Sequence, residues 1–103
     1  MLKPIELMSP KNKKKLNILR NKLDKIDNRL IDIIKIRTNL VTEVVKLKDY
    51  KNQIIDKKRI SIILKKIKKK SILKRIDPKI TNRIWKNMIW SYINYERKIF
   101  KKK

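Results

Sequence analysis

Arg37 is the residue most suggestive of chemistry, because it interrupts an otherwise apolar series. Steps of three and four residues place the members of this series on one face of a long helix: Leu16, Leu19, Leu23, Ile26, Leu30, Ile33, Leu40, Val44 and Leu47. A guanidinium cannot shed its charge, and burying an unpaired cation is costly. We therefore expect an anion to bind opposite Arg37.

Two further charged residues fall where helical phase predicts burial. Lys48 follows Arg37 by eleven residues, which is three helical turns, so the two cations face the same way. Together they suit a small molecule with two anionic groups, although Lys48 is equally suited to extend into solvent near a helix end. Glu96 is seven residues after Ile89 and continues an apolar stripe. It is suited to pair with either cation, or to present a proton.

Other catalytic constellations are missing. The chain has no Cys and no His, no glycine-rich phosphate loop and no carboxylate cluster for a metal, which predicts neither metal nor cofactor. Asp56 and Arg59 have the spacing of an ordinary surface pair. Arg20 lies about 100° from Arg37 around the helix, so it does not easily reach the same site from its own helix but could reach that of a partner chain in a symmetric dimer. Any catalysis would therefore use positioning and electrostatics.

The elements that position these residues are all helical. Apolar periodicity predicts helices over residues 11–50, 54–74 and 78–100, and no strand. Ser9-Pro10 and Asp77-Pro78 are typical of an N-cap followed by the first helical residue. The fold class predicted is all-α with three helices, one long and two shorter. The predicted organisation is an N-terminal arm (1–10), a helical domain (11–100) and a basic tail (101–103).

The chain is short for a stable single core. At 103 residues without disulfides, oligomerisation is the expected source of further stability. The long helix also carries a second apolar stripe, which consists of Ile31, Ile34, Val41 and Val45. A helix buried on two sides requires cover from a partner, so we expect an intertwined homodimer. No signal peptide or bilayer-spanning segment is recognisable, which predicts a cytoplasmic protein with no membrane partner.

The formal net charge of +23 is typical of proteins that bind nucleic acid or anionic membranes. However, Gly and Ala are absent while Lys, Ile and Asn abound, which indicates a bias towards A/T-rich codons. A basic helical nucleic-acid-binding protein, with the apolar series as a coiled coil and Arg37 as a register device, is the alternative from another class. The lack of interleaved aromatic residues and of a nucleic-acid motif weighs against it.

Over about residues 16–98, the sequence resembles the all-α chorismate mutases. The first-helix motif corresponds to Leu19-Arg20, Leu23-Asp24-Lys25-Ile26-Asp27, Leu30, Arg37, Leu40-Val41 and Val44 to Lys48. The second-helix motif corresponds to Asp56-Lys57-Lys58-Arg59 with Ile63-Leu64, and the third to Asp77-Pro78 and Ile84-Trp85 through Glu96. The resemblance implies an intertwined dimer with shared active sites. It also implies the rearrangement of chorismate to prephenate in phenylalanine and tyrosine biosynthesis.

The resemblance also implies roles for single residues. Arg37 would bind one substrate carboxylate, and the partner subunit's Arg20 would bind the other. Lys48 would face the breaking ether oxygen together with Glu96. A Glu at this position must be protonated to donate a hydrogen bond, so activity should fall as pH rises.

Two positions depart from the family pattern. Asp56 and Arg59 would line the second-helix wall, but the Glu that follows the family Arg is replaced by Ile60. The family Ser near the third-helix acid falls on Tyr92, which we expect to contact substrate. Both departures resemble the isochorismate pyruvate lyases, which share the fold and form salicylate. Chorismate mutase is therefore the first hypothesis, and isochorismate pyruvate lyase is the alternative within the fold.

Overall fold

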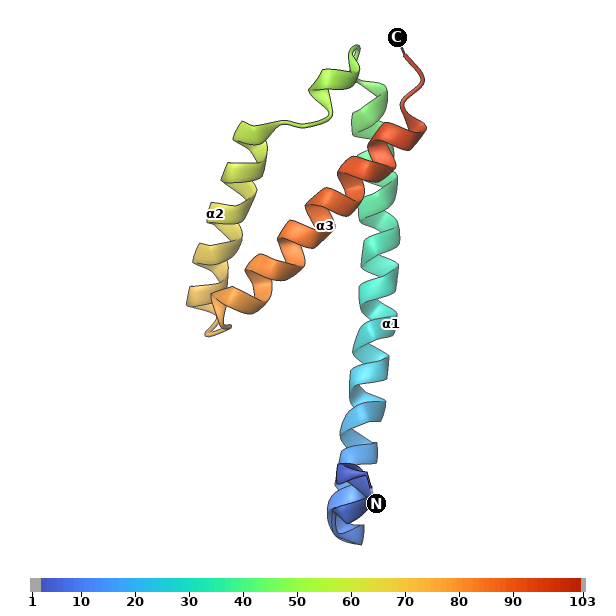
Figure 1. Ribbon diagram of the computed structural model, residues 1–103, viewed down its shortest axis with the longest axis vertical. Coiled ribbons are helices and arrows are strands. Elements are labelled where there is room, and N and C mark those ends of the chain that lie inside the picture. Colours follow the sequence, from blue (N-terminus) through green and yellow to red (C-terminus); the bar gives the residue numbers. More distant parts are fainter. Residues whose placement is uncertain (1–2, 103) are drawn as a thin grey trace. The chain divides into compact units, whose positions relative to one another are not determined.

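The computed structural model describes residues 3–102, and residues 1, 2 and 103 of the predicted arm and tail lie outside the described residues. The elements are η1 (Pro4–Leu7), α1 (Pro10–Lys46), η2 (Lys51–Gln53), α2 (Lys57–Leu73) and α3 (Pro78–Ile99) (Figure 1). No strand occurs between residues 3 and 102, which confirms the all-α class with one long and two shorter helices. None of the described helices is long and apolar enough to cross a membrane.

The helix starts follow the caps expected from the sequence. Ser9 Oγ accepts a hydrogen bond from the Asn12 N–H at 3.2 Å, and Pro10 is the first residue of α1. Asp77 Oδ1 accepts from the Lys79 N–H at 3.0 Å, and Pro78 begins α3. Proline has no N–H to satisfy and its φ is already helical, so it starts a helix without loss of a hydrogen bond.

The end of α1 corrects one prediction, because the helix stops at Lys46 and not at residue 50. The Gln53 side chain supplies the reason. Its Oε1 accepts hydrogen bonds from the backbone N–H groups of Asp49 and Tyr50, at 2.8 and 2.9 Å. These N–H groups therefore have a local acceptor outside the helix, and no Gly or Pro is needed to end it. Lys48 lies beyond the helix end, so helical phase does not set its direction.

The start of α2 corrects a second boundary. The helix begins at Lys57 and not at residue 54, because Asp56 is its N-cap and accepts through Oδ1 from the Arg59 backbone N–H at 2.9 Å. Ile54 precedes the cap and is buried, with 3% of its surface exposed. The apolar residue that suggested an earlier helix start is thus part of the core.

The turn between α2 and α3 is closed by two backbone hydrogen bonds. The Ile76 N–H donates to Ser71 O at 2.9 Å, and the Arg75 N–H donates to Ile72 O at 3.1 Å. This is the Schellman arrangement, which requires a left-handed residue just after the helix. Arg75 takes that conformation, with φ 58°.

The chain divides into two compact units, Met1–Arg37 and Thr38–Lys103, and α1 contributes residues to both. In the second unit, α2 and α3 run antiparallel, and the C-terminal half of α3 lies beside the last turns of α1 (Figure 1). The buried core of this unit consists of Val45, Ile54, Ile89 and Ile93. Partly buried apolar residues pack against it: Ile55, Ile60, Ile63, Leu64, Ile99 and Phe100.

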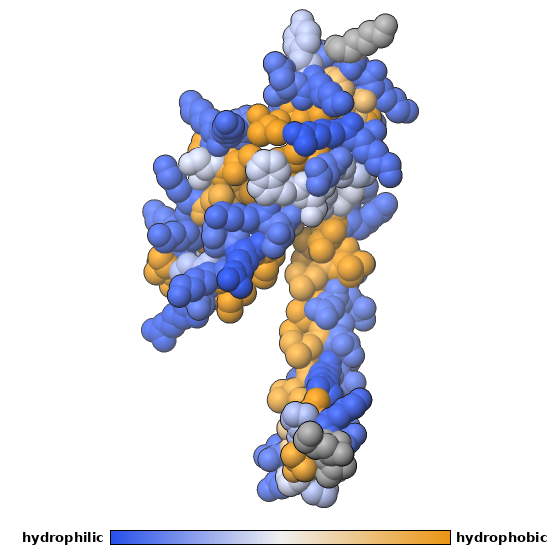
Figure 2. Space-filling model, in the orientation of Figure 1, coloured by the Kyte–Doolittle hydropathy of each residue, from blue (hydrophilic) through white to orange (hydrophobic). Residues whose placement is uncertain are grey.

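The apolar series of α1 is exposed. Seven of its members, each with 48–58% of its surface exposed, define what we call the α1 apolar face: Leu19, Leu23, Ile26, Leu30, Ile33, Leu40 and Val44. Figure 2 shows apolar side chains gathered as a stripe along this helix. Such a continuous stripe is far larger than the scattered apolar residues of ordinary protein surfaces. Of the second stripe, Val45 is the member that is buried, in the core of the second unit.

Candidate active site

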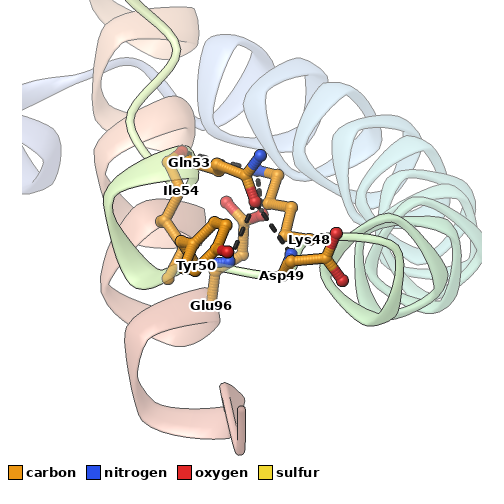
Figure 3. Close-up of polar contacts among 6 residues, drawn as sticks. All are labelled: Lys48, Asp49, Tyr50, Gln53, Ile54 and Glu96. Carbon is orange, nitrogen blue, oxygen red and sulfur yellow. Dashed lines mark hydrogen bonds and ion pairs between the residues drawn. The ribbon is translucent and has the colours of Figure 1, made fainter. Parts of the chain in front are cut away.

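The centre of the candidate site is an ion pair between Lys48 and Glu96. Lys48 Nζ lies 3.1 Å from Glu96 Oε1, and the two side chains are only 19% and 9% exposed (Figure 3). The ammonium also donates a long hydrogen bond, 3.5 Å, to the carbonyl oxygen of Ile54. The cation and the acid that the sequence placed on buried faces therefore meet, although Lys48 reaches Glu96 from the turn after α1.

The turn that carries Lys48 is held by its own side chains. Gln53 points back across the turn, and its amide oxygen accepts from two successive backbone N–H groups, those of Asp49 and Tyr50 (Figure 3). Ile54, whose carbonyl accepts from Lys48, belongs to the buried core. The ammonium is therefore anchored on one side by α3 and on the other by the core, an arrangement that preorganises a charge.

Lys48 and Asp56 open onto a hollow of about 820 Å³. The hollow is lined by Val44, Leu47, Lys48, Gln53, Ile55, Asp56 and Lys57. Its volume is within the range that small-molecule sites occupy. Asp56 has a structural task as well, since its Oδ1 caps α2.

Two other second-helix positions lie apart from this hollow. Arg59 is exposed on the first turn of α2, and its backbone N–H binds Asp56. Ile60 is partly buried and packs against the core cluster. The position at which the family carries a Glu is therefore part of an apolar contact in this chain.

Tyr92 and Tyr95 connect α3 to α1 through hydrogen bonds between their hydroxyl groups and two threonines. These contacts were not predicted from the sequence. The Tyr92 hydroxyl lies 2.7 Å from Thr38 Oγ1, and the Tyr95 hydroxyl lies 3.1 Å from Thr42 Oγ1. The sequence does show that the two threonines share one face of α1, four residues apart, and that the two tyrosines share one face of α3, three residues apart. These spacings alone do not identify which threonine contacts which tyrosine.

The two arginines of the predicted site belong to the first unit, Met1–Arg37. Arg20 is exposed on α1, while Arg37, the last residue of that unit, is partly buried. Both are held on a continuous helix, so their spacing along α1 is fixed. Among the predicted site residues, the structure links Lys48 to Glu96 through their side chains, and Asp56 to the backbone N–H of Arg59.

The chemistry available in the second unit is a fixed ammonium beside a carboxyl group. Such a pair is suited to stabilise negative charge that develops on a substrate oxygen, without a covalent step. Among residues 3–102, no group of three or more His, Cys, Asp or Glu side chains is placed to hold a metal ion.

Comparison with known protein families identifies the family to which the chain belongs. The family model for chorismate mutase type II matches residues 19–97. This range includes every predicted site residue on the three helices and in the turn after α1. A search of curated proteins and a search of solved structures each find no significant match. The matched region covers most of the sequence and contains both members of the Lys48–Glu96 pair. The chain therefore belongs to the chorismate mutase type II family.

Proposed function

We propose that this protein is a chorismate mutase, which converts chorismate to prephenate for phenylalanine and tyrosine synthesis. The observation that carries the proposal is the Lys48–Glu96 pair, 3.1 Å apart and largely withdrawn from solvent within a chorismate mutase type II chain. A buried ion pair contributes little net stability compared with apolar packing. Its presence is better explained by chemistry at the adjoining hollow.

The proposed mechanism is a pericyclic rearrangement in which the ether C–O bond breaks while a C–C bond forms. Arg37 and the partner subunit's Arg20 each bind one carboxylate of the substrate and hold it in the reactive conformer. Negative charge develops on the ether oxygen as the bond breaks. The Lys48 ammonium, already anchored by Glu96 and Ile54, faces that oxygen and stabilises the charge without reorganisation.

In this proposal Glu96 donates the second hydrogen bond to the ether oxygen. Its Oε1 accepts from Lys48, so the proton required for donation resides on Oε2. A carboxyl oxygen accepts a hydrogen bond from an ammonium in either protonation state, so the same contact serves the ion pair seen in the structure and the protonated acid that donation to the substrate requires. Lys48 thereby orients the acid as well as binding the oxygen.

The variant Glu96→Gln tests this role, because the amide oxygen replaces Oε1 as the acceptor from Lys48 and the amide nitrogen can donate to the ether oxygen. We expect this variant to remain active, which is measured as kcat/KM on protein shown to be folded by its melting curve. A folded Gln variant that is inactive would contradict the role given to Glu96.

We further propose that the active form is a homodimer. The α1 apolar face is too extensive to remain in water, and none of its residues belongs to the core cluster of Val45, Ile54, Ile89 and Ile93. A second copy of α1 offers a matching stripe, as expected for a two-fold symmetric contact. The same contact would deliver the partner subunit's Arg20 to the site.

Ile60 favours a second candidate, isochorismate pyruvate lyase. The resemblance implies that the family Glu binds a hydroxyl group of the substrate, and an apolar residue that packs on the core cannot make that hydrogen bond. Purified protein should therefore be incubated with chorismate and with isochorismate, and the products identified. Prephenate from chorismate supports the mutase, and salicylate with pyruvate from isochorismate supports the lyase. Turnover of neither, with tight DNA binding that weakens steeply with salt, would refute both.

A further inference from the structure

We propose that Thr38 is a positioning residue for the active site, through the hydroxyl of Tyr92. The proposal rests on the proposed function, since it assumes that a substrate binds beside Glu96. The Thr38 Oγ1 and the Tyr92 hydroxyl are 2.7 Å apart, in a partly buried contact between α1 and α3. This is a short distance for two hydroxyl groups and indicates a well-formed hydrogen bond.

Tyr92 is adjacent to the reaction centre on its own helix. It precedes Glu96 by four residues, so the two side chains lie on the same face of α3, one turn apart. Glu96 in turn contacts Lys48. A substrate that binds Glu96 would therefore be within reach of the Tyr92 side chain, one helical turn away.

A tyrosine at this place needs an anchor. Rotation about its side-chain bonds moves the hydroxyl over a wide arc, because the hydroxyl is at the far end of a rigid ring. Thr38 is β-branched and lies on a helix, which limits its rotamers and makes it a firm attachment point. The hydrogen bond thus selects one direction of the Tyr92 ring before substrate arrives, and less ordering is required on binding.

The chain contains a matched control one turn away. Thr42 and Tyr95 form the same type of contact between the same helices, at 3.1 Å. Thr42 Oγ1 also donates to Thr38 O at 3.0 Å, so Tyr95 must be the donor to Thr42. This second pair borders a separate hollow of about 480 Å³, whose lining includes neither Lys48 nor Asp56.

The test compares Thr38→Val with Thr42→Val, which remove a hydroxyl from nearly isosteric side chains. Thr38→Val should raise KM for the substrate about threefold to tenfold with little change in kcat, the size expected for one net hydrogen bond that aids binding. Thr38→Ser should restore KM. Thr42→Val should lower thermal stability but leave KM unchanged, and melting curves on all variants establish that they are folded.

A double-mutant cycle with Tyr92→Phe tests whether Thr38 affects KM through the Tyr92 hydroxyl. If Thr38 acts through the Tyr92 hydroxyl, Thr38→Val should cause no further change in KM in the Tyr92→Phe background. The positioning role is wrong if the two valine variants raise KM equally, or if Thr38→Val leaves KM unchanged in an active enzyme. A wild type that turns over neither chorismate nor isochorismate overturns the proposed function as well, so the two failures are distinguishable.

Discussion

Lys48→Met should lower kcat by about a hundredfold to a thousandfold, the loss typical of removing one preorganised group that stabilises a developing oxyanion. Methionine keeps the unbranched aliphatic stem but cannot donate a hydrogen bond. The decrease should appear in kcat and in kcat/KM together, because the interaction with the ether oxygen strengthens only in the transition state. Steady-state kinetics with chorismate, or with isochorismate if that is the substrate, measure it.

This variant also leaves Glu96 without its cation, so its stability needs a separate control. Replacing one member of a buried pair is strongly destabilising, whereas replacing both with apolar residues is often neutral. Lys48→Met/Glu96→Met should therefore melt close to the wild type and still be inactive. Lys46→Met changes an exposed lysine at the end of α1 and should retain full turnover. Near-normal kcat in folded Lys48→Met would exclude Lys48 from the chemistry.

Leu30→Asp should convert the proposed dimer into monomers and reduce turnover by on the order of a hundredfold or more, since each site would lose the guanidinium supplied across the interface. Leu30 lies in the middle of the α1 apolar face, where a carboxylate would have to be buried without a partner. Light scattering measures the oligomeric state. Ile18→Asp introduces the same charge at an exposed α1 residue outside that face and should leave the dimer intact.

Mixing two inactive variants tests the shared site directly. Arg20→Ala removes the residue that the proposal assigns to the neighbouring site, while Lys48→Met inactivates a chain's own site. In a mixed dimer one site would combine Lys48 of one chain with Arg20 of the other. Random exchange should then restore about a quarter of wild-type activity, because half of the dimers are mixed and each has one intact site. No recovery after exchange would mean that each site uses residues of a single chain.

The starts of α1 and α3 were predictable because a side-chain cap is followed there by proline. Ser9-Pro10 and Asp77-Pro78 each combine a cap with proline, and α1 and α3 begin where these pairs predict. The end of α1 was not predictable from local preference, because no Gly or Pro marks it. It depends on the Gln53 amide, which reaches back to Asp49 and Tyr50 only once the turn has formed.

In the candidate site, too, features set by the local sequence were predictable, whereas contacts between helices were not. Burial of Glu96 followed from its phase on an apolar stripe, and its partner proved to be one of the two cations considered. The hydroxyl contacts of Thr38 and Thr42 were missed, because Thr and Tyr are compatible with both partly buried and exposed positions. Hydrophobic periodicity locates buried faces, but it does not assign which polar groups meet across them.

The turn at Arg75 has a consequence for how stability is distributed in a chain that contains no glycine. An L-amino acid in the left-handed region is disfavoured by about 1–2 kcal/mol, a strain that glycine at the same position avoids. Arg75 nevertheless takes φ 58°, supported by the backbone hydrogen bonds that close α2. Hydrogen bonding, and not residue preference, therefore dictates the reversal between the two shorter helices. Because the chain contains no glycine, the turn between α2 and α3 keeps a backbone strain that glycine would avoid. This strain lies outside the core and away from every residue assigned to catalysis.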